Sequence, residues 1–335
     1  MSDRITEEAE GNERQLGEII RHAGSREQPP AAVRDAVRQA TAAEWRAVAA
    51  ARARRRSLRL SMTAAAAVAG LTVWVVLPLM QAPAAVVAAV TRVSGPVDVG
   101  GGVFSTATPI RPGGAVMAAA EIRSGPGGRV ALQMGGTSVR MDEESAMTMT
   151  APGRIALTRG AIYVDSGAAA SGLLPLVIDT PYATVEHLGT QYEARLAGDG
   201  VRVRVREGRV RLLEGDVSVE GGAGEQVTVS GSGDVRREPV ASTDAGWAWA
   251  GEIAPPFDIE NKPLAGFLQW VGRETGREVV FESPASEGEA ARVVLRGSVA
   301  GLAPERALAA VLATTRLAYR EAPGRLLIDF KAGDR

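Results

Sequence analysis

The pattern of apolar and polar positions changes several times along this chain, and the sharpest change falls at residues 60–80. The run LSMTAAAAVAGLTVWVVLPLM is almost wholly apolar, and no charged residue occurs between Arg59 and Arg92. A helix over this run, rising about 1.5 Å per residue, would span the roughly 30 Å of bilayer hydrocarbon. The pattern predicts one transmembrane helix over 60–80. A block of arginines precedes this run: Arg52, Arg54, Arg55, Arg56 and Arg59. Because positive charge beside a transmembrane helix stays in the cytoplasm, the N-terminus is expected inside and the remainder of the chain exported.

Residues 1–57 carry two amphipathic helix patterns, separated by Pro29-Pro30. In each, apolar residues spaced three and four apart gather on one helical face. Two narrow apolar faces bury too little surface to offset the entropy lost on ordering, so this arm is expected to order on a partner. A juxtamembrane linker with incidental helicity is the alternative, but a tryptophan on such a face favours binding. The residues expected to make the contact are Leu16, Ile19, Ile20, Val33, Val37 and Trp45.

From residue 86 to residue 235 the pattern consists of short apolar runs between glycine-rich turns, without a helical period. Gly135-Gly136 separates two such runs as a hairpin turn would. Over 201–206 valine alternates with arginine, which predicts a strand with its valines in the core and its arginines facing outward: Arg202, Arg204 and Arg206. The spacing of these strands predicts an all-β domain over 86–235, either a solenoid-like roll or a sandwich.

The last part of the chain has a mixed pattern. Residues 236–256 are predicted to form a polar linker, in which Trp247 and Trp249 pack onto a neighbouring domain. Residues 257–331 are predicted to form a small α+β domain with the order β-α-β then β-α-β-β. Its expected strands are 257–259, 278–281, 292–295, 317–320 and 326–330.

Two helices are expected between these strands. The first should be capped by Asn261 and end at Gly276, and the second should begin at Pro304. Apolar residues at helical spacing define the buried face of each helix. Those of the first are Leu264, Phe267, Leu268 and Val271, and those of the second are Leu308, Val311 and Leu312.

Composition narrows the function classes. The 335 residues carry a net charge of −1, which suits two or three small domains and argues against a direct nucleic-acid surface. With no cysteine and two histidines, neither a disulfide nor a transition-metal site is expected. His187 is expected at the surface or hydrogen-bonded, and Asp142-Glu143-Glu144 in a solvated turn. No catalytic constellation occurs in the sequence, so the prediction is a protein that is not an enzyme and uses no cofactor.

Three segments of the β region form a recognisable pattern: Ile178-Asp179-Thr180-Pro181, then Leu188-Gly189-Thr190-Gln191-Tyr192, then the run VRVREGRVRL over 203–212. Through these segments the β region resembles the FecR family. Glycine permits backbone conformations barred to other residues, and a Thr-Pro pair fixes an extended or turn geometry, so the motif is expected to maintain the fold. Its members are Thr180, Pro181, Leu188, Gly189, Thr190, Tyr192, Glu207 and Gly208, with Tyr192 expected in the core.

Residues 257–331 contain four characteristic segments, which are Phe257-Asp258-Ile259, NKPLAGFLQWVGRETGREVVF, VVLRGSVAG and PERALAAVLATTRLAYR. Through these segments they resemble the secretin and TonB short N-terminal domain. Trp270 lies on the first predicted helix and is expected either at the edge of the core or in contact with a receptor.

Together the resemblances imply an anti-sigma regulator of the bacterial inner membrane, single-pass, with a cytoplasmic N-terminus and a periplasmic C-terminus. Such proteins bind an extracytoplasmic-function sigma factor through the cytoplasmic arm, either holding it inactive or helping to activate it. They sense the signalling domain of a TonB-dependent outer-membrane receptor through the exported part, in the regulation of iron or nutrient uptake. Regulated proteolysis near the span is the implied release step. The alternative is an envelope structural protein that binds peptidoglycan, polysaccharide or a secretion channel, with the arm as an anchor.

Overall fold

The computed structural model describes residues 21, 30–36, 38–39, 41–42, 85–101, 107–167, 176–187, 189, 191–215 and 217–333. The chain divides into two compact units, Met1–Ala82 and Pro83–Arg335. Among the described residues, no helix is both long enough and apolar enough to cross a membrane. The predicted span at 60–80 lies outside these residues, as do Leu16, Ile19, Ile20, Val37 and Trp45. Val33 lies in a helical stretch, residues 31–36, and its side chain is exposed.

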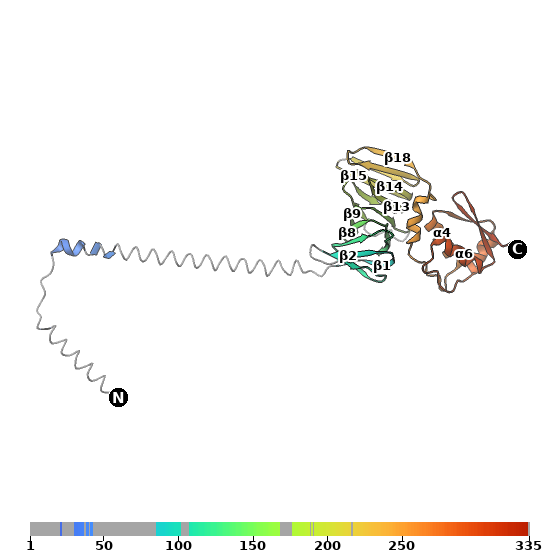
Figure 1. Cartoon of the computed structure of the whole chain (residues 1–335), viewed down its shortest axis with the longest axis horizontal. Coiled ribbons are helices and arrows are strands. Elements are labelled where there is room, and N and C mark those ends of the chain that lie inside the picture. Colours follow the sequence, from blue (N-terminus) through green and yellow to red (C-terminus); the bar gives the residue numbers. More distant parts are fainter. Residues whose placement is uncertain are drawn as a thin grey trace, which may run out of the picture. The chain divides into compact units, whose positions relative to one another are not determined.

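The second unit begins with a β domain built of two nine-stranded sheets, which we call sheet A and sheet B (Figure 1). Sheet A has the order β18 (Val235–Pro239), β17 (Glu225–Ser230), β14 (Gly200–Glu207), β13 (Gln191–Ala197), β10 (Ala161–Asp165), β7 (Thr137–Met141), β6 (Arg129–Met134), β1 (Val86–Ser94) and β4 (Ala115–Met117). Sheet B has the order β16 (Val217–Gly222), β15 (Arg209–Glu214), β12 (Thr184–His187), β11 (Val177–Asp179), β9 (Arg154–Arg159), β8 (Ala146–Ala151), β5 (Ala120–Ser124), β2 (Val97–Gly101) and β3 (Thr108–Pro109).

The chain crosses between the two sheets repeatedly, so neighbours within a sheet are often distant in sequence. Within these two sheets, the described strands pair antiparallel except for β9 and β11, which run parallel. The hairpin predicted at Gly135-Gly136 joins β6 to β7, with Met134 opposite Thr137. The all-β prediction is therefore confirmed for this part of the chain.

Alternate side chains of both sheets meet in one apolar core. This arrangement follows from the two-residue period of a strand, which sends successive side chains to opposite faces. On β14, Val201, Val203 and Val205 are fully buried in the core, as predicted. Sheet B contributes Met147, Met149, Ile155, Leu157, Ile178, Val185, Val210 and Leu212.

The opposite face of sheet A is also covered, which the alternation on β14 did not reveal. Arg204 and Arg206 point away from the core, yet they are only 6% and 8% exposed. Their predicted outward direction is confirmed, but the face on which they lie is covered by other parts of the chain. Residues 236–256, expected to be a polar linker, contain regular structure instead: 236–239 complete β18, and a short 3₁₀ helix η2 (Ala245–Trp247) and the helix α3 (Ala248–Glu252) follow. Trp247 and Trp249 from this segment are buried together with sheet A residues, so the packing predicted for them is confirmed.

The C-terminal module follows with α4 (Leu264–Thr275), β19 (Glu278–Phe281), α5 (Pro284–Arg292), α6 (Pro304–Ala313), β20 (Leu317–Ala322) and β21 (Arg325–Phe330). Its sheet has the order β19-β21-β20, with β19 and β21 parallel. The helices pack their predicted apolar faces into one core, and Gly276 ends α4 in the left-handed conformation, as expected. The mixed α+β class of this module is confirmed.

The predicted elements of the module differ from the structure in four respects: two strands, one helix and one helix cap. Residues 257–259 are not a strand, and 292–295 contribute only one isolated bridge, between Val294 and Pro263. The helix α5 was not expected, because it presents almost no apolar stripe; a Ser283–Ser286 capping box and Pro284 in its first turn start it. Asn261 does not cap α4, since Pro263 occupies the cap position and Asn261 itself has a φ of 58°.

Candidate functional site

The most unusual surface of the second unit is the contact between the outer face of sheet A and η2, α3 and α4, which we call the junction. Its centre is Tyr163 on β10, which is fully buried. The rings of Trp247 and Trp249 meet it edge to face, with centroids at 6.0 and 6.5 Å. Ala131 and Ala161 lie beside Tyr163 in the same cluster, and their small side chains leave room for the indoles. The predicted linker is therefore held against the sheet.

A buried ion pair joins β7 to α4 at the junction. Arg140 Nη1 lies 2.6 Å from Glu274 Oε2, and Arg140 Nη2 lies 2.8 Å from Oε1, so the pair is bidentate. Arg140 and Glu274 are 1% and 6% exposed. The same guanidinium donates to the carbonyl of Ala250 and lies 5.1 Å from the centroid of Tyr163. Burial alone would lower the pKa of Arg140, but Glu274 raises it, so the side chain stays charged.

A second ion pair lies one residue earlier on α4. Arg273 donates to Asp165 at the end of β10 and, through Nη1, to Glu207 Oε2 at 2.8 Å. Gln191 Nε2 donates to the same Asp165 at 3.0 Å. Burial would raise the pKa of Asp165, but these hydrogen bonds and the charge of Arg273 hold it below its ordinary value.

The two outward arginines of β14 bind the segment that leads into α3. Their guanidinium carbons lie 4.5 Å (Arg204) and 4.7 Å (Arg206) from the ring centroid of Trp247. Arg206 also donates to the carbonyls of Ser242 and Glu274, at 2.9 and 3.0 Å, and Arg204 pairs with Asp244. A hydrogen bond donated by the backbone amide of Gly246, together with Arg204, lowers the pKa of Asp244.

Carboxylates of sheet A are also used at the junction. Glu193 is fully buried; it accepts from Trp249 Nε1 at 2.9 Å and pairs with Arg195 and Arg202. Asp142 is 6% exposed and accepts from Arg129 and Arg195, so the expectation that it lies in a solvated turn is wrong. Arg129 reaches Glu252 on α3 at 2.8 Å. These carboxylates therefore each lie beside at least one arginine, whereas Arg206 is held by carbonyl oxygens and aromatic rings.

Close backbone approach fixes one position of the junction. A Cβ on Gly276 would lie 2.2 Å from the carbonyl oxygen of Ser242, and the φ of Gly276 is 69°. Both observations require glycine, because a side chain would clash and the left-handed conformation is costly for other residues. The end of α4 is thereby placed directly against the start of the helical linker.

The motif that resembles FecR lies beside the junction, and its described members have structural roles. Thr180 Oγ1 accepts from the amide of Ala183 at 3.0 Å and closes the turn before β12. Gly189 and Gly208 have φ values of 73° and 78°. Tyr192 is fully buried in the core of the two sheets, as expected, and Glu207 binds Arg273. Leu188 and Thr190 lie outside the described residues, and Pro181 is exposed in the bend before β12.

His187 differs from its expected surroundings. It is 6% exposed, its ring stacks against Tyr192 with centroids 6.2 Å apart, and neither ring nitrogen has a hydrogen-bond partner among the described residues. Burial lowers its pKa, because an unpaired charge in this core is costly. The expectation of a surface or hydrogen-bonded histidine is wrong.

This placement predicts an acid-sensitive β domain. In the unfolded chain His187 has a pKa of about 6.5, whereas in the folded state it binds a proton only at lower pH. Stability should therefore be retained above that pH and fall as the pH drops below it. His187→Leu should lessen this fall in urea unfolding followed over the same pH range, and His22→Gln, which removes the other histidine, should not. An equal pH dependence in both variants would contradict the assignment.

Trp270 lies away from the junction. Its ring is 5.8 Å from Phe257 and 5.7 Å from Phe267, at the edge of the core of the C-terminal module. Of the two places left open for it, the structure supports the core edge. The junction residues were not named from the sequence as a site. The alternating arginines of β14 and the two tryptophans are the sequence features that mark the junction. Neither feature shows that the two segments pack against each other.

Comparison with known proteins bears on the β domain. The family model described as FecR protein matches residues 120–211, from β5 into β15. The resemblance to the FecR family is thereby confirmed for this stretch, which holds Tyr163, Arg140, Glu193 and the arginines of β14. No curated protein matches the chain.

Two crystal structures of a candidate anti-sigma factor from Parabacteroides distasonis, at 2.50 and 1.65 Å resolution, are similar at 16% identity. Each alignment covers 63% of this chain, and 98% and 99% of theirs, with TM-scores of 0.33 and 0.32. Scores this low carry no argument about this chain, so the assignment rests on the family match.

Proposed function

We propose that this protein is a single-pass regulator of the bacterial inner membrane that controls an extracytoplasmic-function sigma factor. The observation that carries the proposal is the FecR family match over residues 120–211. The role is regulatory rather than enzymatic. In this proposal residues 1–57 bind the sigma factor in the cytoplasm, and the β domain and C-terminal module lie in the periplasm.

The signal in this proposal comes from a TonB-dependent outer-membrane receptor, whose signalling domain contacts the C-terminal module. The junction supports a path from that module to the β domain, because α4 carries both Glu274 and Arg273, each paired with a residue of sheet A. A shift of α4 would have to break or move both pairs together. Release of the sigma factor by regulated proteolysis near the span completes the proposal.

The arm is tested with the full-length chain. Trp45→Ala should weaken retention of the sigma factor at least tenfold. A tryptophan anchor at an interface often contributes about 2 kcal/mol or more of binding free energy. Co-purification from cells that express the tagged chain measures this retention. Arg46→Ala, one position off the apolar stripe, is the matched control and should retain the sigma factor. If deletion of residues 1–57 leaves signalling normal and no sigma factor is retained, the envelope structural role replaces the proposal.

A further inference from the structure

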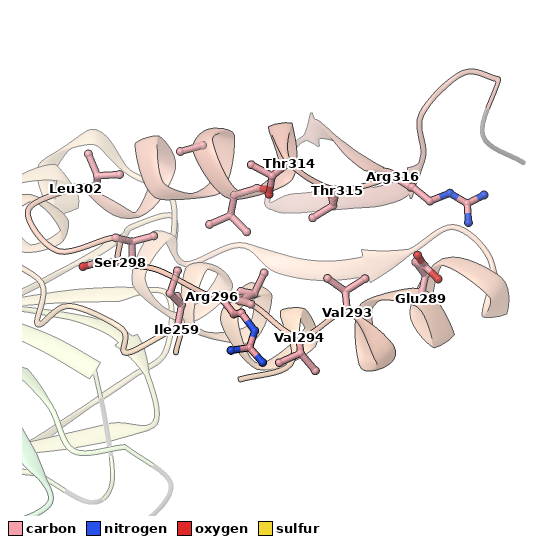
Figure 2. Close-up of a pocket in the computed structure, with 14 residues that line it drawn as sticks. Ile259, Glu289, Val293, Val294, Arg296, Ser298, Leu302, Thr314, Thr315 and Arg316 are labelled. Atoms are coloured by element: carbon pink, nitrogen blue, oxygen red, sulfur yellow. The ribbon is translucent and has the colours of Figure 1, made fainter. Parts of the chain in front are cut away.

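A groove of about 610 Å³ opens in the C-terminal module, away from Tyr163 and the junction. Figure 2 shows Val293, Val294 and Arg296 along one side and Thr314, Thr315 and Arg316, at the end of α6, along the other. Apolar side chains line it from both walls, among them Ile259, Val299, Leu302 and Val311. A hollow lined in this way can receive apolar side chains of a second molecule.

One wall of this groove is an extended segment with an unused backbone edge. On one edge, Leu264 donates to the carbonyl of Val293, and Leu295 donates to the carbonyl of Lys262, at 2.8 Å each. On the alternate residues, Val294 and Arg296, neither the N–H nor the C=O has a hydrogen-bond partner among the described residues. These two residues are exposed, with Val294 at 56%. An open edge of this kind pairs readily with an added strand.

The charges at the groove select the kind of strand. Arg296 lines it with a side chain that is 76% exposed, and its ion-pair partner Glu260 lies 4.0 Å away. The carboxylate that lines the groove, Glu289, is paired with Arg292 at 3.1 Å. The exposed guanidinium of Arg296 therefore places positive charge at the rim of the groove, which complements an acidic partner.

The outermost strand β18 of sheet A offers a contrasting edge. It carries Arg236, Arg237 and Pro239. Charged residues and proline on an edge strand discourage pairing with other chains. The Val294–Arg296 edge instead adjoins an apolar hollow, which could receive alternate side chains of an added strand.

We propose that this groove binds an extended peptide segment of a partner protein, added as a strand along Val294–Arg296, in which apolar residues alternate with acidic ones. The proposal deepens the function proposed above and rests on it for the identity of the partner as a receptor. The binding chemistry itself rests only on the groove.

The test uses the full-length protein in mild detergent and a fluorescein-labelled peptide in which valine alternates with glutamate. Fluorescence anisotropy should show binding that weakens at least tenfold when lysine replaces glutamate in the peptide. N-methylation of the amides on one edge of the peptide should have an effect of similar size, because it removes main-chain donors that strand addition needs. Equal binding of the N-methylated peptide would overturn strand addition.

A matched pair of variants locates the site. Ala310 is exposed on α6 and lines the groove, whereas its neighbour Ala309 is exposed and does not. Ala310→Phe should abolish peptide binding and Ala309→Phe should preserve it, with the same unfolding midpoint in both. Equal binding by the two variants, or no binding by the unaltered protein, would overturn the proposal. So would a dimer of the chain that Ala310→Phe alone dissociates, because a second copy would then occupy the groove.

Two separate parts of the chain make the two contacts that are measured, so each can be lost without the other. Retention of the sigma factor depends on residues 1–57, and peptide binding depends on the groove. Loss of peptide binding with normal sigma-factor retention would refute only the groove. Normal peptide binding without a retained sigma factor would refute only the regulatory role.

Discussion

Replacing Glu274 with alanine should lower the free energy of unfolding by about 3–5 kcal/mol, because the guanidinium of Arg140 then stays buried without its counter-charge. The Ala250 carbonyl and the face of Tyr163 remain beside Arg140, but neither carries a full charge. Urea unfolding of the full-length protein, followed by tryptophan fluorescence, measures the loss. If the cost exceeds the free energy that holds α4 on sheet A, the junction should open first and expose Trp247 to quenchers.

Two variants show whether the effect belongs to the buried pair. Glu278→Ala removes an ion pair with Arg325 in which both side chains are more than half exposed, and it should cost at most about 1 kcal/mol. The double variant Arg140→Leu/Glu274→Leu removes both buried charges and should recover most of the stability that Glu274→Ala loses. A Glu274→Ala protein as stable as Glu278→Ala would mean that the pair contributes nothing to the fold.

The contrast between Val203 and Arg204 shows how far the sequence predicts this fold. Alternation on β14 correctly places the valines in the core, because a strand sends successive side chains to opposite faces. The same alternation says nothing about what covers the second face. Because arginine is usually exposed, its place in the alternation suggests that solvent covers this face. Arg204 and Arg206 are nevertheless buried, because tryptophan faces, carbonyls and a carboxylate replace water around their guanidiniums.

The C-terminal module shows a second limit. The faces of α4 and α6 are predictable, because apolar residues recur at helical spacing and Gly276 and Pro304 mark ends. The helix α5 has no such stripe and is specified by its cap at Ser283 instead. The segment 292–295 reads as a strand from its valines, yet it makes only one bridge. Neither the groove nor the junction could be predicted, because each is formed by segments distant in sequence.

The charged junction differs in kind from the apolar core. Burial of charged pairs costs desolvation free energy that offsets much of their attraction, so such a contact specifies one geometry more than it adds stability. Between sheet A and α4 the pairs Arg140–Glu274 and Asp165–Arg273 fix both the rotation and the position of the helix. In the proposed regulator, this contact is where a force on the C-terminal module would reach the FecR-like domain.

Tyr163→Ala should be the other severe change, lowering the free energy of unfolding by about 3–5 kcal/mol. The ring is fully buried between Trp247 and Trp249, and its removal leaves a cavity that neither indole can fill while it is held by a hydrogen bond to Ala241 or Glu193. The two guanidiniums of Arg140 and Arg206 also lose the aromatic face beside them. Urea unfolding of the full-length protein measures the loss.

Tyr163→Phe separates the ring from the hydroxyl group. Among the described residues the hydroxyl oxygen accepts one hydrogen bond, from Arg206 at 3.4 Å, so near neutral pH this variant should lose at most about 1.5 kcal/mol. Burial raises the pKa of Tyr163 to about 12, whereas tyrosine in an unfolded chain has a pKa of about 10. The unfolded state therefore loses its proton first as the pH rises through this window, and stability falls with it. Tyr163→Phe should lessen that alkaline loss and leave a part that belongs to Tyr192, whose pKa burial also raises. An alkaline loss unchanged by Tyr163→Phe would mean that Tyr163 is accessible to water, and the junction would then be open in solution.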